Sequence, residues 1–317
     1  MKVVVTGALG YIGSRLIRDL ASASPGCQIV LLDNLASERY ASLYGLPESA
    51  SYQFIEGDVL SADLSRVFSG ADAVIHLAAI TNGAGPDLIE RMRNVNLDGT
   101  ERVARSCAAD RVALLLPSTT SVYGVPYGIV SEDCPPEQLV PQSAYATWKL
   151  QSERLLESLG REQGLNFVIL RMATIFGPSI GMRFHTAVNK FCWRAVTGQP
   201  IEVWRTAAHQ FRPYLDLSDA VRAMLFLLRR RQFDRRTYNV LTLNATVAHV
   251  VEVLAQFVPE LRVTYVDSPL MNDLSYCVDH QRLSGLGFEF SGSLERGIAD
   301  TIEIVTGRAV RTATRRR

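Results

Sequence analysis

Short apolar runs alternate with amphipathic stretches along the first half of the chain. Continuous apolar runs bounded by turn residues predict buried strands at 3–5, 28–32, 52–56, 73–77, 112–116 and 166–171. Apolar residues at helical spacing predict helices at 11–23, about 87–108 and 143–163. Such strands separated by helices are typical of a parallel sheet covered on both faces. We therefore expect an α/β fold with a doubly wound, Rossmann-type parallel sheet.

The pattern becomes irregular after Arg171, where the turn-rich segments FGPSIG and TGQP appear. Helices are predicted at 218–230 and 246–257, and a strand at 261–266. We therefore expect a larger domain of residues 1–172 plus about 213–242, a smaller, discontinuous α/β domain of about 173–212 plus 243–307, and a basic tail of 308–317.

The composition narrows the classes of function. The 317 residues carry 33 basic and 32 acidic side chains, and a net charge of +1 gives no overall field to attract nucleic acid or an anionic membrane. The five cysteines show no CxxC spacing, so we expect neither a disulfide framework nor a metal site. The first residues read as a strand rather than a signal peptide, and the apolar runs are far shorter than the ~20 residues of a membrane span. We expect a cytoplasmic protein.

Gly7, Gly10 and Gly13 form a GxxGxxG pattern between the first predicted strand and the first predicted helix. Glycines at such a turn permit a tight bend, close approach of a pyrophosphate, and close packing of helix on strand. The first helical N–H groups, around Tyr11 and Ile12, then offer hydrogen bonds to phosphates. The context favours a dinucleotide site; an ordinary strand–helix turn is the alternative.

Asp33 ends the second predicted strand, twenty residues after Gly13. A carboxylate there accepts hydrogen bonds from the adenosine ribose and repels a 2′-phosphate, which favours NAD over NADP. Two alternatives stay open. In the first, Asp33 is only a turn or cap residue before Asn34. In the second, Arg39 nearby holds a 2′-phosphate, and the cofactor is NADP.

Tyr145 and Lys149 are four residues apart in a predicted helix, so their side chains share one face. An ammonium group beside a phenol lowers the phenol pKa, which lets the phenol act as a base. A pair of this spacing on an exposed helix surface is the alternative.

The segment STTSVYG, residues 118–124, follows the fifth predicted strand. Ligands of doubly wound sheets bind beyond the carboxyl ends of the strands, so hydroxyls here are placed to hold a substrate oxygen. A hydroxyl-rich turn without a ligand is the alternative.

Taken in order, these motifs resemble the extended short-chain dehydrogenase/reductases, in the NAD-dependent epimerase/dehydratase family that acts on nucleotide sugars. The matching segments run from residue 2 to about 225 and are GALGYIGSRL, LLDNL, GDV, VIHLAA, NVNLDGT, STTSVYG, YATWK, LR, FGP and RPYLDLSDA. The resemblance implies that NAD binds to the larger domain and the substrate to the smaller one.

The resemblance also implies roles for single residues. Thr119, Tyr145 and Lys149 match the hydroxyl that holds the substrate, the general base, and the partner of that base. The candidate cofactor-binding residues are Gly7, Gly10, Tyr11, Ile12, Gly13, Asp33, Asn34, Asp58, Val59, Leu77, Ala78, Ala79, Asn96, Tyr145 and Lys149. The candidate substrate-binding residues are Thr81, Thr120, Thr174, Arg183 and Arg212, of which Arg212 matches an arginine that grips the nucleotide diphosphate.

The chain departs from the family in the substrate region. The dehydratases that it resembles carry Asp-Glu after the catalytic Thr, whereas Thr120 and Ser121 stand here, so the acid and base of dehydration are missing. Thr174 stands where many epimerases have Asn, and Trp-Arg-Thr at 204–206 replaces a glycine-rich turn. A second phosphate-gripping arginine is missing from 268–273, and Arg183 is the candidate replacement.

We therefore expect an NAD-dependent nucleotide-sugar epimerase that acts at C4 through transient oxidation to a keto-sugar. The alternative is a net oxidoreductase of a keto-sugar or small alcohol; a non-catalytic NAD-binding regulator is a minor one. The resemblance further implies a homodimer formed by the helices at 87–108 and 143–163, with Trp148, Leu155 and Leu159 on the shared face. Packing of these side chains within one subunit is the alternative.

Overall fold

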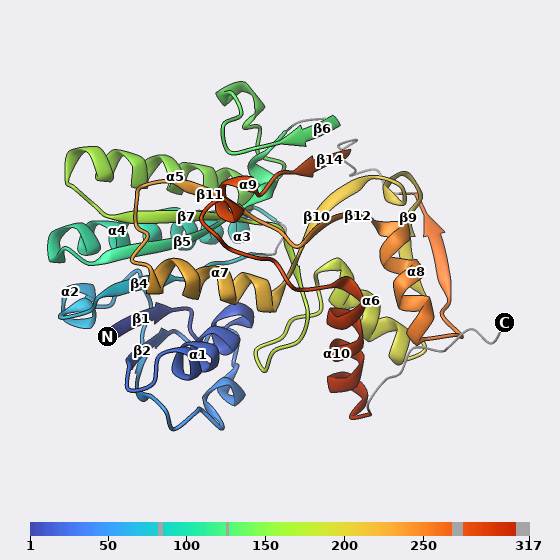
Figure 1. Cartoon of the computed structure of the whole chain (residues 1–317), viewed down its shortest axis with the longest axis horizontal. Coiled ribbons are helices and arrows are strands. Elements are labelled where there is room, and N and C mark those ends of the chain that lie inside the picture. The colour runs from blue at the N-terminus through green and yellow to red at the C-terminus, as the bar shows by residue number, and fades with distance from the viewer. Residues whose placement is uncertain (82–84, 125–126, 268–274, 309–317) are drawn as a thin grey trace.

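A seven-stranded parallel sheet forms the centre of the larger part of the molecule (Figure 1). The computed structural model describes residues 1–81, 85–124, 127–267 and 275–308. The strands are β1 (Lys2–Thr6), β2 (Gln28–Asp33), β3 (Ser51–Glu56), β4 (Ala73–His76), β5 (Ala113–Thr119), β7 (Phe167–Met172) and β11 (Thr237–Val240). Their order, β11–β7–β5–β4–β1–β2–β3, changes direction between β1 and β4. The predicted doubly wound α/β fold is confirmed, and this switch point is where such sheets bind ligands.

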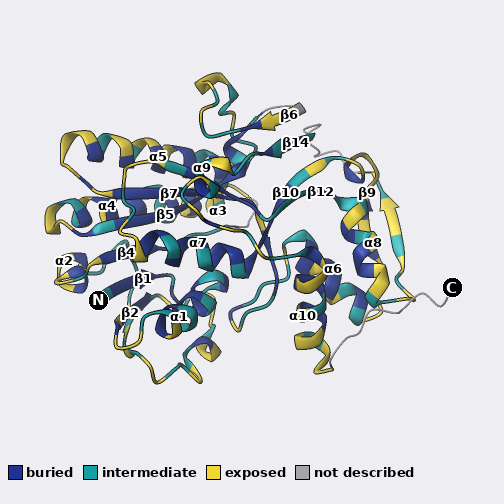
Figure 2. Cartoon of the chain, in the orientation of Figure 1, coloured by how far each residue is buried: buried dark blue, intermediate teal, exposed yellow. Residues whose placement is uncertain are grey.

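The alternating side chains of β1 explain how helices cover both faces of the sheet. Val3 and Val5 pack with α1 (Tyr11–Ala23) and α7 (Leu217–Arg229). Val4 packs with α2 (Leu64–Phe68), α4 (Gly99–Asp110) and α5 (Ala144–Glu162). Successive residues of a strand point to opposite faces, so one apolar run contributes to two cores. Figure 2 shows the buried strands, with exposed residues on the outer sides of α4 and α5.

Part of the helix face that we expected between two subunits lies inside this core. Leu159 of α5 is 2% exposed and packs with Val103 of α4 and Phe167 of β7. Leu155 is partly buried against the same cluster. The expectation that Leu159 faces a second subunit is therefore wrong, because its side chain points toward the sheet.

The long helix expected over residues 87–108 is interrupted. It consists of α3 (Pro86–Arg93), a π-helical turn at Asn94–Asp98, and α4. Asn96 in this turn is fully buried, donates from Nδ2 to the Ile80 carbonyl (2.7 Å) and accepts at Oδ1 from the Ile80 N–H (2.8 Å). Single π-helical turns inside helices occur frequently at functional sites, and apolar periodicity does not reveal them.

A second group of elements packs beside the large sheet (Figure 1). Three strands form a sheet in the order β12–β10–β8, while β13 pairs with β9 and β14 with β6. The elements are β6 (Tyr127–Val130), β8 (Thr174–Phe176), α6 (Ala187–Val196), β9 (Ile201–Trp204), β10 (Phe211–Asp216), β12 (Leu243–Thr246), α8 (Val247–Phe257), β13 (Val263–Val266), β14 (Ser275–Val278), α9 (Gln281–Ser284) and α10 (Leu294–Thr306). Of these elements the sequence predicted only α8 and β13. The other strands are short and lack a continuous apolar run, and the helices α6, α9 and α10 were not predicted.

The helices α6, α8 and α10 enclose a hydrophobic cluster of their own, around Phe176, Phe191 and Ile298. No helix in the described part of the chain combines the length and apolarity needed to cross a bilayer.

Tyr11 joins the first helix to the segment after β8. Its hydroxyl donates to the Gly177 carbonyl (2.5 Å) and accepts from Asn189 Nδ2 (3.0 Å). Asn189 Oδ1 accepts from the Gly177 N–H (3.1 Å), which closes a ring of buried hydrogen bonds. A Cβ added at Gly181 would lie 2.6 Å from the carbonyl oxygen of Gly10, so the same segment also packs directly on the glycine turn.

We expect Tyr11→Phe to lower the free energy of unfolding by about 1–3 kcal/mol, because the buried Gly177 carbonyl loses its donor. Tyr52→Phe is the matched control. The Tyr52 hydroxyl is buried without a hydrogen-bond partner among the described residues, so its removal should not lower the free energy of unfolding and should raise it by up to about 1–3 kcal/mol. Urea denaturation measures both variants, and equal effects would show that the ring of hydrogen bonds adds no stability.

Candidate active site

The glycine turn brings three backbone segments into direct contact. Gly7 has a φ of 65°, and a Cβ there would lie 2.6 Å from the Ala78 nitrogen just after β4. A Cβ at Gly13 would lie 2.4 Å from the Ala8 carbonyl oxygen. Only glycine fits such positions. Gly10 precedes α1 without a side-chain cap, so the first N–H groups of the helix face whatever binds there.

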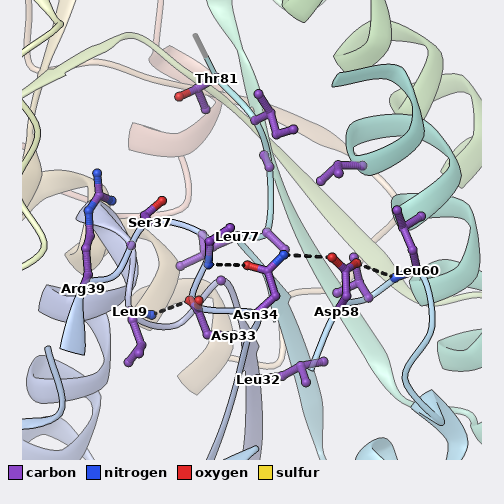
Figure 3. Close-up of a pocket in the computed structure, with 18 of the residues that line it drawn as sticks. Leu9, Leu32, Asp33, Asn34, Ser37, Arg39, Asp58, Leu60, Leu77 and Thr81 are labelled. Atoms are coloured by element: carbon purple, nitrogen blue, oxygen red, sulfur yellow. Dashed lines mark hydrogen bonds between the residues drawn. The ribbon is translucent and has the colours of Figure 1, made fainter. Parts of the chain in front are cut away.

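A cavity of about 610 Å³ opens beyond the carboxyl ends of β1, β2 and β4 (Figure 3). Asp33 Oδ2 accepts a hydrogen bond from the Leu9 N–H (3.0 Å), and Asn34 Nδ2 donates to Asp58 Oδ2 (2.8 Å). The candidates that line this cavity are Gly7, Gly10, Asp33, Asn34, Asp58, Val59, Leu77, Ala78, Ala79, Thr81 and Arg183. A glycine-lined helix start beside strand-end carboxylates suits a dinucleotide, with phosphates at the helix and ribose hydroxyls at Asp33.

A second cavity of about 320 Å³ adjoins the first and contains the three candidate catalytic residues. Thr119 ends β5, which continues beyond the predicted strand, and Tyr145 and Lys149 lie near the start of α5. Lys149 Nζ lies 6.0 Å from the centre of the Tyr145 ring. The other candidates that line this cavity are Gly7, Gly10, Tyr11, Ile12, Gly13, Leu77, Ala79, Thr81, Thr174 and Arg183.

Burial governs the two titratable candidates. Lys149 is 2% exposed; burial lowers its pKa from 10.5 to about 8, and the charge of Glu153 opposes this fall. Burial raises the pKa of Tyr145, against the lowering effect of the Arg183 guanidinium. The sequence led us to expect that Lys149 lowers the pKa of Tyr145. In the chain without ligands, the cost of desolvating a phenolate is larger than the benefit of the cations around it, so the phenol is protonated at neutral pH.

His76 is a buried structural residue that bridges two threonines. Burial, with a smaller contribution from the Lys149 charge, lowers its pKa to about 3, so the ring is neutral. Thr6 Oγ1 lies 2.7 Å from Nδ1 and Thr100 Oγ1 lies 3.1 Å from Nε2. Because Thr100 donates its own proton to the Asn96 carbonyl (2.7 Å), Nε2 carries the imidazole proton and donates to Thr100. This series of hydrogen bonds connects β1 and β4 to the π-helical turn.

Two further candidates line neither cavity. Asn96 holds the backbone of Ile80, which lines the first cavity, and its carbonyl accepts from Thr100, the partner of His76. Thr120 is 2% exposed, and its carbonyl accepts from the Tyr276 hydroxyl (3.3 Å). The structure therefore does not bring Thr120 to the place that its predicted substrate role requires, because the turn after β5 directs it into the protein.

Arg212 also lines neither cavity. It lies in β10 and donates to the Phe211 carbonyl (3.0 Å) and to Gln210 Oε1 (2.8 Å). Its guanidinium carbon lies 5.9 Å from the centre of the Tyr276 ring. Arg212 matches the position of the family's diphosphate-binding arginine in the sequence, but its side chain does not line either cavity. The segment 268–273, in which we looked for a second arginine, lies outside the described residues.

The junction of the cavities contains Arg39, which the sequence suggested only as an alternative holder of a 2′-phosphate, and His185, to which it gave no role. Arg39 lines both cavities, and its pKa is lowered by burial against the effect of Asp33. His185 lines the first cavity, and burial, followed by Arg183 and Arg39, lowers its pKa to about 4. Both are single residues on irregular segments, where the sequence offers no periodic signal. Arg39 and Arg183 make this junction electropositive, whereas His185, with its lowered pKa, is neutral.

The chain belongs to the NAD dependent epimerase/dehydratase family, whose model matches residues 3–240. This finding confirms the resemblance. A trifunctional UDP-glucose 4,6-dehydratase/UDP-4-keto-6-deoxy-D-glucose 3,5-epimerase/UDP-4-keto-L-rhamnose-reductase of Arabidopsis thaliana, RHM3, is 28% identical over 96% of this chain. The match covers 47% of that protein, so the chain spans about half the length of this curated relative.

Solved structures match the chain over nearly its whole length. MoeE5 in complex with UDP-glucuronic acid and NAD has a TM-score of 0.82 and 29% identity, with 97% of this chain and 99% of that chain covered. The UDP-glucuronic acid 4-epimerase from Bacillus cereus, in complex with UDP-glucuronic acid and NAD, has a TM-score of 0.86 and 25% identity at the same coverage. NAD is the cofactor of the family, and the tight approach at Gly7 and Gly13 and the strand-end Asp33 fit it.

We expect Asp33→Ala to weaken NAD binding by about 10- to 100-fold, because the ribose loses a charged acceptor worth about 1.5–3 kcal/mol. The preference for NAD over NADP should narrow at the same time. Asp19→Ala removes an equal charge from the outer side of α1, where Asp19 pairs with Arg15, and should change neither value. Calorimetric titration with both dinucleotides measures the effect. Tighter binding of NADP by the unchanged protein would show that Arg39, rather than Asp33, decides the choice.

Proposed function

We propose that this chain is an NAD-dependent nucleotide-sugar epimerase acting at C4. One observation carries the proposal: Thr119, Tyr145 and Lys149 line one cavity whose described lining includes no carboxylate. Elimination of water needs an acid and a base beside the catalytic hydroxyl, but Ser121 offers a hydroxyl there and Thr120 is buried. Epimerisation needs only the removal and return of one hydride and one proton.

Each residue then has a chemical task. NAD, when bound, supplies the acceptor and donor of a hydride. Thr119 and Tyr145 hold the sugar hydroxyl, and Tyr145 takes its proton and later returns it. The cationic Lys149 and Arg183 favour the phenolate form of Tyr145. The keto-sugar turns in the cavity and is reduced on its other face, so no net oxidation occurs.

Arg183 favours a sugar that carries an anionic group. It lines both cavities and donates from Nη1 to Thr81, while its Nε is buried without a hydrogen-bond partner among the described residues. A buried cationic group is stabilised by a bound anion. The nucleotide diphosphate is one such anion. MoeE5 and the Bacillus cereus epimerase bind UDP-glucuronic acid, whose sugar carboxylate is another, and we propose a uronic acid as the sugar.

We also propose the division into a larger NAD-binding domain (1–172 and about 213–242), a smaller substrate domain (about 173–212 and 243–307) and a basic tail. The separate hydrophobic cluster of α6, α8 and α10 supports this division.

We further propose a cytoplasmic location. The free thiols of all five cysteines support a reducing compartment of this kind.

We expect the purified protein, without added cofactor, to interconvert a UDP-sugar with its C4 epimer, and UDP-glucuronic acid in preference to UDP-glucose. Tyr145→Phe should lower turnover by about 10²- to 10⁴-fold, because the base is lost. Tyr40→Phe, at a tyrosine that is 50% exposed, is the control and should leave turnover unchanged. NMR of the sugar signals follows the reaction.

Other outcomes of this experiment identify the alternatives. Turnover of Tyr145→Phe at the rate of the unchanged protein would refute the proposed mechanism. Accumulation of NADH in the presence of substrate and added NAD would identify a net oxidoreductase. Bound NAD without conversion of any sugar, keto-sugar or small alcohol would identify a regulator.

We propose a homodimer formed by the outer faces of α4 and α5, with Trp148 and Leu155, which are partly buried, at the interface. Light scattering at micromolar concentration should give about twice the 35.0 kDa of one chain. The mass of one chain would contradict the dimer.

A further inference from the structure

Glu153 and Arg171 form a buried ion pair beside the second cavity. Arg171 Nη2 donates to Glu153 Oε2 at 2.7 Å, and Nε donates to both carboxylate oxygens at 3.1 and 3.2 Å. Glu153 is 1% exposed and Arg171 is 5% exposed. Ser118, which precedes Thr119 in β5, donates its hydroxyl to Glu153 Oε1. Arg171 Nη1 donates to the Tyr123 hydroxyl (3.0 Å), so both carboxylate oxygens and all three guanidinium nitrogens are engaged.

A stable fold does not require a buried pair of this kind. Removal of two charges from water costs about as much as their attraction returns, and apolar side chains of similar volume often stabilise as well or better. The place of the pair is more informative than its energy. Glu153 follows Lys149 by one turn of α5, so the two side chains share a face. Glu153 also anchors Ser118, the neighbour of Thr119.

Glu153 supplies the negative charge that acts on Lys149. Burial lowers the pKa of Lys149 to about 8, and Glu153 opposes that fall. The other groups around Lys149 supply no negative charge: the neutral His76 of β4, the protonated Tyr145, the cationic Arg171 of β7 and Arg183, and the uncharged Ser118, Thr119 and Asn96 of β5 and the π-helical turn. Glu153 forms its ion pair with Arg171 and not with Lys149, which leaves the ammonium N–H groups for the cavity.

We propose that Glu153, held by Arg171 and Ser118 one turn along α5 from Lys149, is a positioning residue that acts through Lys149 and keeps its ammonium group charged beside Tyr145. The proposal rests on the proposed function, because it gives Lys149 a part in the chemistry of Tyr145. Glu153 itself touches neither the substrate nor the cofactor; it acts through Lys149.

The composition of the chain makes a direct test practical. Only three lysines are present, Lys2, Lys149 and Lys190, so carbon-13-labelled lysine gives three side-chain signals that can be followed by NMR as the pH is raised. Lys149→Arg assigns the signal of interest. We expect its midpoint near pH 8 in the unchanged protein and lower by about 1–3 pH units in Glu153→Gln. The alkaline limb of kcat should move to lower pH by the same amount.

Two further variants separate charge from folding. Glu157→Gln removes an equal charge from an exposed position one turn further along α5, and should leave the Lys149 midpoint unchanged. Glu153→Gln alone leaves Arg171 buried without its partner and can unfold the protein. Glu153→Gln/Arg171→Met removes both charges, so we expect it to fold. Its Lys149 midpoint should lie below that of the unchanged protein but fall less than in Glu153→Gln, because a nearby cation is lost as well. An unchanged midpoint in this folded double variant would overturn the proposal and leave the pair a structural role.

The titration is read without turnover, so it is independent of the proposed function. If Lys149 responds to Glu153 as expected while no nucleotide sugar is converted, the proposed function fails and the effect of Glu153 on Lys149 stands. If a sugar is converted and the Lys149 midpoint ignores Glu153, only the present proposal fails.

Discussion

The approach of the Gly7 backbone to the Ala78 backbone sets the position of nearly everything in the site. It brings the end of β1 against the end of β4 and starts α1 at the switch point of the sheet. Neighbouring strands are about 4.8 Å apart, so β2 places Asp33 on one side of this point and β5 places Thr119 on the other. Gly7 lines both cavities. A side chain at Gly7 would separate β1 from β4 and so disturb both cavities at once.

Electrostatics divides the site in the same way. Carboxylates line only the first cavity, at Asp33 and Asp58, and Lys149 and most of the hydroxyls line the second, while Arg39 and Arg183 line both. The phenol of Tyr145 therefore lies in a region that is poor in water but rich in positive charge. Its raised pKa in the chain without ligands shows that desolvation prevails there. The basicity needed for catalysis is thus a property of the assembled site and not of the Tyr–Lys spacing alone.

The sequence predicted the sheet and most of the cofactor residues, because both depend on short-range patterns. A continuous apolar run marks a buried strand, and glycines or an acidic residue at strand ends mark backbone approach and ribose contact. The sequence could not predict the π-helical turn at Asn94–Asp98, because the apolar pattern of the whole stretch still indicates a helix there. Nor could it predict short strands such as β9 and β14, which become strands only through their partners.

The substrate residues were harder still, and for a different reason. Thr120 and Arg212 were assigned by position in a family pattern, but neither side chain lines a cavity, because orientation depends on tertiary contacts. The LR segment was matched to the family, but the ion pair of Glu153 and Arg171 was not predicted, because charged residues are usually exposed. The sequence contained a weak signal for each residue. Arg171 is a charged residue inside an apolar strand, and Glu153 lies four residues after Lys149, on the same face of the helix.

The two adjacent hydroxyls at the end of β5 face different neighbours. Ser118 donates to Glu153, whereas Thr119 Oγ1 accepts from the Ser121 N–H at the start of the next turn. The apolar residues before them alternate in the same way, with Leu114 and Leu116 in one core and Leu115 in the other. Loss or gain of a single residue in this strand would therefore exchange the hydroxyl that anchors the charge network with the one offered to the substrate, and would reverse both cores with it. The strand can accept changes of side chain far more easily than a change of length, so natural variation here should take the form of substitutions and not of insertions or deletions.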